Sequence, residues 1–174
     1  MTIKSLIKRN YKKQPQLEYP DYKSSILRAP KKDKFFFPSS PSETSGPKFN
    51  KKIIGKLDND LTLNFAKNNQ NPIGHKIIVH GTIRDQFLKP IDGALIEIWQ
   101  ANAGGKYLHM RDQNIATIDP NFAGCGRYIT EDNGTYQFIT IQPGPYPYPN
   151  RGVEWRPMHI HFSIFGKSFG QRLI

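Results

Sequence analysis

The chain has one cysteine, Cys125, and lacks any apolar run long enough to cross a bilayer. A single thiol cannot form an internal disulfide, which agrees with a reducing compartment, so we expect a cytoplasmic protein. The basic N-terminus also lacks the apolar core and the small-residue cleavage site of a secretory signal. These absences argue against a membrane protein and against a disulfide-stapled secreted domain.

Acidic residues are scarce, with 14 Asp and Glu against 25 Lys and Arg, so the formal net charge is +11. Basic chains often bind nucleic acid, but these lysines are dispersed and form no helical stripe or nucleic-acid fold signature. The charge therefore leaves three alternatives open: an arm for an acidic partner subunit, a general lysine bias, or a field that attracts anionic substrates. We expect binding to neither nucleic acid nor membrane.

Amphipathic helices are lacking as well. Residues 1–75 are interrupted by proline, serine and asparagine, which resist long helices and central strands. This irregular N-terminal arm still carries apolar side chains, so we expect it to wrap a domain or a partner. The apolar side chains of the arm are those of Phe35, Phe36, Phe37, Leu61, Leu63 and Phe65.

Residues 76–174 have the texture of short strands. The strand-like segments are KIIVHGTIRD, GALIEIWQA, GRYITEDNGTYQFITI with a hairpin-type turn at EDNG, and MHIHFSIFG. This pattern predicts an all-β sandwich or barrel. Because the chain stops on the apolar pair Leu173–Ile174, we expect the C-terminal part of the sandwich to be missing and the chain alone to be poorly soluble.

A His-x-His pair near the end of the chain is the first candidate for metal chemistry. His159 and His161 lie on one face of a predicted strand, about 7 Å apart at roughly 3.3 Å rise per residue. An exposed or hydrogen-bonded pair would look the same. No nearby Cys or well-aimed carboxylate completes a zinc or facial-triad site, which leaves Tyr146 as an oxygen donor. Phenolate next to imidazole would suit a hard trivalent iron.

Seven motifs carry a resemblance that runs from about Tyr19 to Ile174. They are PDYKSS, SETSGP, PIGHKIIVHG, IEIWQANAGGKY, DPNFAGCGRY, IQPGPYP and WRPMHIHFSIFG. Through them the chain resembles the intradiol ring-cleaving dioxygenases, and among these the β subunits that act on protocatechuate. The resemblance implies a β-sandwich of the intradiol type that carries an irregular N-terminal arm.

The same resemblance implies a complete ligand set for non-haem Fe(III): Tyr107, Tyr146, His159 and His161. Tyr146 and His159 match the axial ligands, and Tyr107 and His161 match the equatorial ones. Tyr146 matches the ligand that leaves the iron and accepts a catechol proton. Without the motif, Tyr107 would be interpreted as a loop aromatic that packs on the sandwich.

Three further residues match positions that face the substrate in the family. Arg156 would stabilise negative charge on the ring, although a surface salt bridge is the alternative. Tyr22 would reach the substrate pocket, although a packing role would look the same. Tyr148 stands where the family typically has tryptophan, so we expect a pocket wall of altered shape.

The resemblance implies that protocatechuate is cleaved with O₂ to 3-carboxy-cis,cis-muconate, in a hetero-oligomer with a homologous α subunit. The alternatives are another catechol, such as catechol or hydroxyquinol, a non-catalytic β-sandwich binding module, and an inactive truncated remnant.

Overall fold

The computed structural model describes residues 21, 32, 51–68, 70–149 and 153–166. Within them, the only helix is the short 3-10 turn η2, Lys51–Ile53. The strands are β1 (Lys76–Thr82), β2 (Leu95–Trp99), β3 (Cys125–Ile129), β4 (Thr135–Ile141), β5 (Tyr146–Pro149), β6 (Val153–Arg156) and β7 (His161–Phe165). The all-β prediction is therefore confirmed. The chain divides into two compact units, and β1–β4 and β7 all belong to the unit of residues 37–148 and 155–174.

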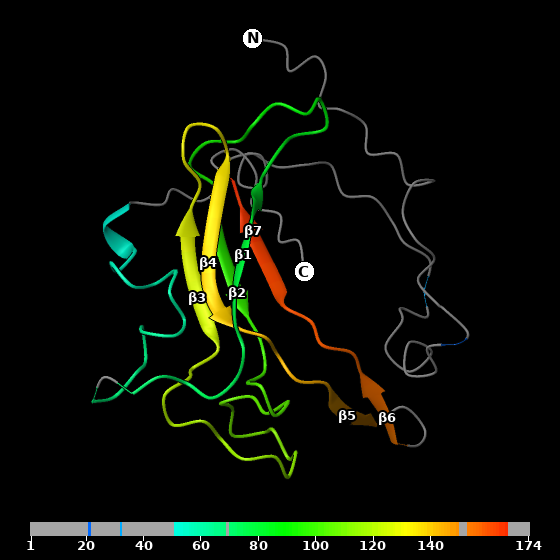
Figure 1. Cartoon of the computed structure of the whole chain (residues 1–174). Coiled ribbons are helices and arrows are strands. Elements are labelled where there is room, and N and C mark those ends of the chain that lie inside the picture. The colour runs from blue at the N-terminus through cyan, green and yellow to red at the C-terminus, as the bar shows by residue number, and fades with distance from the viewer. Residues whose placement is uncertain (1–20, 22–31, 33–50, 69, 150–152, 167–174) are drawn as a thin grey trace. The chain divides into compact units, whose positions relative to one another are not determined.

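The strands form two principal sheets (Figure 1). In the first, β1 pairs antiparallel with β4; in the second, β2 lies between β3 and β7 and is antiparallel to both. The register places Trp99 opposite both Cys125 and His161. Strands β5 and β6 form a separate two-stranded ribbon.

The hydrophobic core lies between these two sheets. Phe138 on β4 and Ile96 and Ile98 on β2 are almost completely buried, because alternate residues of a strand point to the same face. Leu61, Phe122 and Ile141 complete the buried cluster. This packing of sheet on sheet is the predicted sandwich.

A turn segment from the predicted arm packs on both sheets. Leu61 is fully buried, and its backbone N–H donates to the Ile139 carbonyl on β4 at 2.8 Å. The Arg127 N–H on β3 donates to the Asp58 carbonyl at 2.9 Å. Of the other apolar arm residues, Phe35, Phe36 and Phe37 lie outside the described residues. The division of the chain at residue 75 stays a prediction.

The structure differs locally from the expected strands. The EDNG turn exists, with Gly134 at φ 72°, but it joins β3 to β4 in different sheets rather than closing a hairpin. The turn residues determine where the chain reverses, whereas packing in the core determines which strand pairs with β4. Strand β7 begins at His161, so His159 precedes it and strand alternation does not set its direction.

Candidate metal centre

Four aromatic side chains form a contiguous group, which we call the ring cluster: Tyr107, Tyr146, His159 and His161. The Tyr107 and Tyr146 ring centroids are 5.4 Å apart, edge to face. The Tyr146 ring is 5.5 Å from the His159 ring, which is 4.8 Å from the His161 ring. The structure thus brings together all the residues predicted as ligands, from three separate segments.

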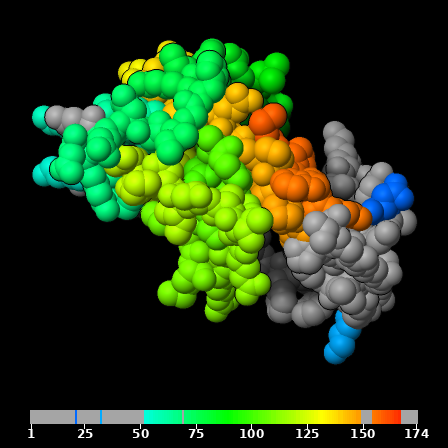
Figure 2. All heavy atoms as spheres, turned by 60° about the horizontal axis from the view of Figure 1, so that its bottom comes forward, coloured from blue at the N-terminus to red at the C-terminus, as the bar shows by residue number. Residues whose placement is uncertain are grey.

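Two loops meet at the tyrosines, and glycine makes the approach possible. Gly105 has φ 79°, and a Cβ there would lie 2.2 Å from the Pro145 carbonyl oxygen. A Cβ on Gly144 would lie 2.3 Å from the Ala103 carbonyl oxygen. Figure 2 shows the lime-coloured and orange segments that contain these loops side by side on one face. The close backbone contact sets Tyr107 beside Tyr146.

The two histidines are positioned by different contacts. His161 on β7 stacks on the indole of Trp99, with centroids 4.8 Å apart and planes inclined by 5°. His159 Nδ1 lies 2.6 Å from the Pro157 carbonyl oxygen. Because a carbonyl only accepts, Nδ1 carries the proton, and Nε2 is left as an acceptor for the Tyr146 hydroxyl at 3.3 Å.

The Tyr107 hydroxyl is buried and has no hydrogen-bond partner among the residues that the structure describes. Burial raises the pKa of Tyr107 well above its usual range, and the neighbouring Tyr146 raises it further. Burial also lowers the pKa of His161, with smaller contributions from His159 and Arg156, which favours the neutral imidazole. Neutral imidazole is the metal-binding form of histidine.

This donor set fits a hard, strongly charged cation. The unpartnered Tyr107 oxygen lacks the electropositive neighbour that a buried oxygen requires, and a metal ion supplies one. Within the described ranges, no group of three or more His, Cys, Asp and Glu is placed to hold a metal. A site here must therefore use phenol oxygen, which a strong Lewis acid deprotonates.

Arg156 supplies positive charge next to the ring cluster. Its guanidinium lies 4.2 Å from the centroid of the Tyr148 ring, which fixes the two predicted substrate-facing residues as a pair. The same charge opposes the effect of burial on the pKa of Tyr107. Tyr22, the third predicted residue, lies outside the described residues.

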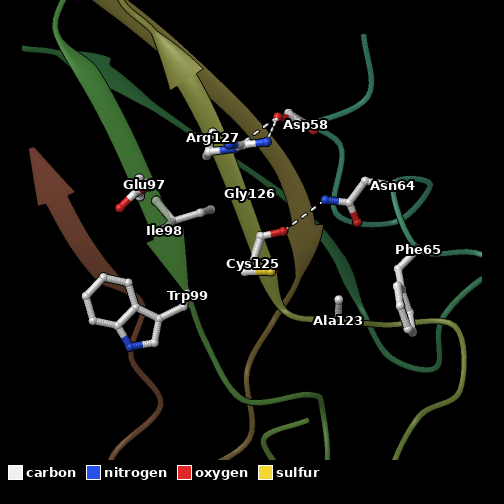
Figure 3. Close-up of a pocket in the computed structure, with 10 residues that line it drawn as sticks. All are labelled: Asp58, Asn64, Phe65, Glu97, Ile98, Trp99, Ala123, Cys125, Gly126 and Arg127. Atoms are coloured by element: carbon white, nitrogen blue, oxygen red, sulfur yellow. Dashed lines mark hydrogen bonds and ion pairs between the residues drawn. The ribbon is translucent and has the colours of Figure 1, made fainter. Parts of the chain in front are cut away.

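Sequence reasoning missed Trp99, although its place opposite His161 follows from the strand register. Trp99 also lines a pocket of about 440 Å³ on the outer side of β2 and β3 (Figure 3). The pocket contains the Arg127–Asp58 ion pair, with an N–O distance of 2.8 Å, and the exposed thiol of Cys125. The ring cluster contributes no side chain to this pocket.

Two family models match the chain. The model described as "Dioxygenase" covers residues 44–174, and the model of the protocatechuate 3,4-dioxygenase beta subunit N terminus covers residues 7–33. This chain belongs to the intradiol ring-cleavage dioxygenases. Members of this family are enzymes, and the predicted resemblance is confirmed.

The chain covers different shares of the intradiol dioxygenases to which it is similar. It is 43% identical to the protocatechuate 3,4-dioxygenase beta chain of Burkholderia cepacia, over 97% of this chain and 72% of that protein. It is 36% identical to catechol 1,2-dioxygenase of Acinetobacter baylyi, over 54% of this chain but 33% of that protein.

A solved intradiol structure shares the fold. The 3-chlorocatechol 1,2-dioxygenase of Rhodococcus opacus 1CP matches with a TM-score of 0.51 at 24% identity, over 80% of this chain and 53% of that one. The chain thus spans about half of that structure. The described part of the chain contains no helix able to span a membrane.

Proposed function

We propose that this intradiol dioxygenase chain is the β subunit of a ferric enzyme that cleaves protocatechuate with O₂ to 3-carboxy-cis,cis-muconate. The observation that carries the proposal is the ring cluster, in which two phenols and two imidazoles lie in mutual contact and the Tyr107 oxygen is buried without a partner. Tyr107, Tyr146, His159 and His161 would hold non-haem Fe(III).

When bound, ferric iron supplies a Lewis-acid centre that favours deprotonated catechol oxygens. The protein's own proton acceptor is Tyr146, whose hydroxyl shares its proton with His159 Nε2. As a phenolate, Tyr146 Oη can accept a proton from a substrate hydroxyl, which is the role of a general base. The Nδ1–H of His159 donates to the Pro157 carbonyl, so Nδ1 takes no part in this proton transfer.

Arg156 and Tyr148 form the adjoining wall of the site. The guanidinium is permanently charged and can stabilise negative charge that develops on the aromatic ring during cleavage. The guanidinium lies over the Tyr148 ring, 4.2 Å from the ring centroid. The carboxylate of protocatechuate suits the positive net charge of the chain, +11.

A homologous α subunit is the proposed partner. The relative at 43% identity is named a beta chain, and residues 7–33 match the N-terminal model of that subunit. These residues lie outside the described part apart from Asp21 and Lys32, so the arm's role rests on sequence alone.

The test is to load the full chain with ferric iron, alone and with a candidate α subunit, and to record visible spectra and product. Tyrosinate bound to Fe(III) gives a visible charge-transfer band, so we expect coloured protein with one iron per chain. Protocatechuate should be turned over faster than catechol or hydroxyquinol, with both atoms of ¹⁸O₂ in the product.

Colourless protein with stoichiometric iron would refute the ligand assignment. A coloured protein that turns over catechol or hydroxyquinol faster would support the ferric site and refute protocatechuate as the preferred substrate.

A further inference from the structure

Lys106, the residue before Tyr107, carries a largely buried side chain that the proposed chemistry does not use. Its side chain is 11% exposed. The Nζ donates to the backbone carbonyls of Asp112, at 2.8 Å, and Asn114, at 2.5 Å. The Asp112 carboxylate lies 3.5 Å away as its counter-ion. Lysine is rarely buried to this extent unless it is paired.

Asp112 closes the same loop from the other side. One carboxylate oxygen accepts the backbone N–H of Tyr107 at 2.7 Å, and the other accepts the N–H of Asn114 at 2.8 Å. The Asn114 side-chain amide donates to the Gly105 carbonyl at 2.9 Å. The backbone from Gly105 to Tyr107 is therefore tied to residues 112–114.

Asn102 also ties the start of the loop: its side-chain oxygen accepts the Lys106 N–H at 3.0 Å, and its backbone N–H donates to the Lys106 carbonyl at 2.9 Å. The apolar side chains of the loop add little, because they point to solvent: Leu108 is 47% exposed, Met110 95% and Ile115 100%. Within the described part of the chain, the Tyr107 hydroxyl makes no hydrogen bond that could fix the ring from its far end. The direction of the phenol thus depends on its contact with the Tyr146 ring and on its backbone, which is held by the polar contacts of residues 102, 106, 112 and 114.

We propose that Lys106 and Asp112 are positioning residues that hold the Tyr107 phenol toward the metal centre. The inference rests on the proposed function, because it takes Tyr107 as an iron ligand. Groups that orient a metal ligand from behind typically change metal affinity about 10–100-fold when they are replaced.

The experiment replaces Lys106 in the full 174-residue chain and compares three variants. Lys106→Met removes the charge and keeps most of the side-chain volume, Lys106→Arg keeps the charge and several N–H donors, and Lys89→Met removes an exposed lysine as a matched control. The readouts are circular dichroism, ferric iron retention against a chelator, the charge-transfer band, and amide exchange at Tyr107 without metal.

We expect Lys106→Met to fold, to lose iron about 10–100 times more readily, and to shift or broaden the band. Amide exchange at Tyr107 should be faster. Lys106→Arg should restore the band, and Lys89→Met should match the parent chain. A role in stability alone would lower the melting temperature and leave the band of the folded protein unchanged.

The two proposals fail in different ways. If the parent chain shows the band and Lys106→Met matches it in band, retention and exchange, the positioning role is wrong and the proposed function stands. If the parent chain binds no ferric iron, the proposed function is wrong, and the positioning role toward a metal falls with it. Should Lys106→Met not fold, Asp112→Asn, which keeps the side-chain shape, is judged by the same readouts and the same criteria.

Discussion

The hydrogen bond between Tyr146 and His159 is the smallest unit of the proposed chemistry. The phenol donates to an imidazole nitrogen whose partner nitrogen is already committed to a backbone carbonyl. One shared proton therefore separates two potential metal donors. Removing that proton leaves an oxygen and a nitrogen 3.3 Å apart, each with a lone pair for a metal ion.

Replacing Tyr146 with Phe tests this unit, because the ring packing stays while the oxygen is lost. We expect weaker iron retention and a fall in kcat/KM of about 10²–10⁴-fold, the range for loss of a general base. Iron analysis and steady-state kinetics measure both. Tyr128→Phe is the matched control, because Tyr128 bonds to Glu131 outside the ring cluster and should leave both values unchanged. Parent-like iron retention and turnover in Tyr146→Phe would contradict the assignment.

Arg156 should separate metal binding from ring cleavage. Arg156→Met keeps apolar contact with Tyr148 but removes the charge, so we expect one iron per chain and a fall in kcat of about 10²–10³-fold. Arg156→Lys should recover part of the rate because the charge returns without the planar fork. Colorimetric analysis measures the iron bound per chain, and oxygen uptake measures the rate of ring cleavage. An unchanged rate in Arg156→Met would assign the residue to packing.

At this scale the sequence predicted the identity of the ring residues through motifs and failed on their geometry. Strand alternation was expected to align His159 with His161, yet His159 lies before β7 and is oriented by the Pro157 carbonyl. The part played by Trp99 needs the β2–β7 register, which a local pattern does not contain.

At the scale of elements, the two glycine-containing loops determine whether the tyrosines meet. Gly105→Ala places a side chain 2.2 Å from the Pro145 carbonyl oxygen at a positive φ. Strained φ costs about 1–3 kcal/mol and overpacking a similar amount, so we expect a loss of at least about 2 kcal/mol in unfolding free energy. Denaturant melts measure the loss, and the charge-transfer band should weaken in parallel.

The adjacent glycine provides a matched control. A Cβ on Gly104 would meet Asn102 Oδ1 at 3.4 Å and the Ala116 Cβ at 3.7 Å, which are ordinary contacts. We expect Gly104→Ala to change stability by less than about 0.5 kcal/mol. If the two variants are equally stable, the close approach of the loops does not position the tyrosines.

The strands themselves were the most predictable elements, since β1, β2, β4 and β7 fall within the β-rich runs of the sequence and β3 begins one residue before its run. Their pairing was not predictable, because the EDNG turn suggests a local hairpin while burial of Phe138 against Ile96 and Ile98 favours a change of sheet. The ribbon of β5 and β6 was also not expected. Prolines inside β5 argue against a central strand, but β5 pairs with only one of the described strands, β6, and an edge strand tolerates proline.

At the scale of the whole molecule, the proposed metal binding would be coupled to folding, because the four ring residues come from separate segments of the sequence. A ligand that binds the folded state alone stabilises it by about 2.7 kcal/mol at one hundred times its dissociation constant. For a chain of this size, that corresponds to a rise in melting temperature of about 5–10 °C. Calorimetry of the chain with ferric iron and after chelation measures the shift.

The control for this coupling is a variant that folds but lacks one of the proposed metal ligands. His161→Phe keeps an aromatic ring against Trp99 and removes a nitrogen from the ring cluster. Its melting temperature should therefore respond to ferric iron by less than half of the parent shift. Equal shifts in melting temperature for both chains would mean that iron binds outside the ring cluster. Folding of the sandwich would then not be linked to metal binding by the two tyrosines and two histidines.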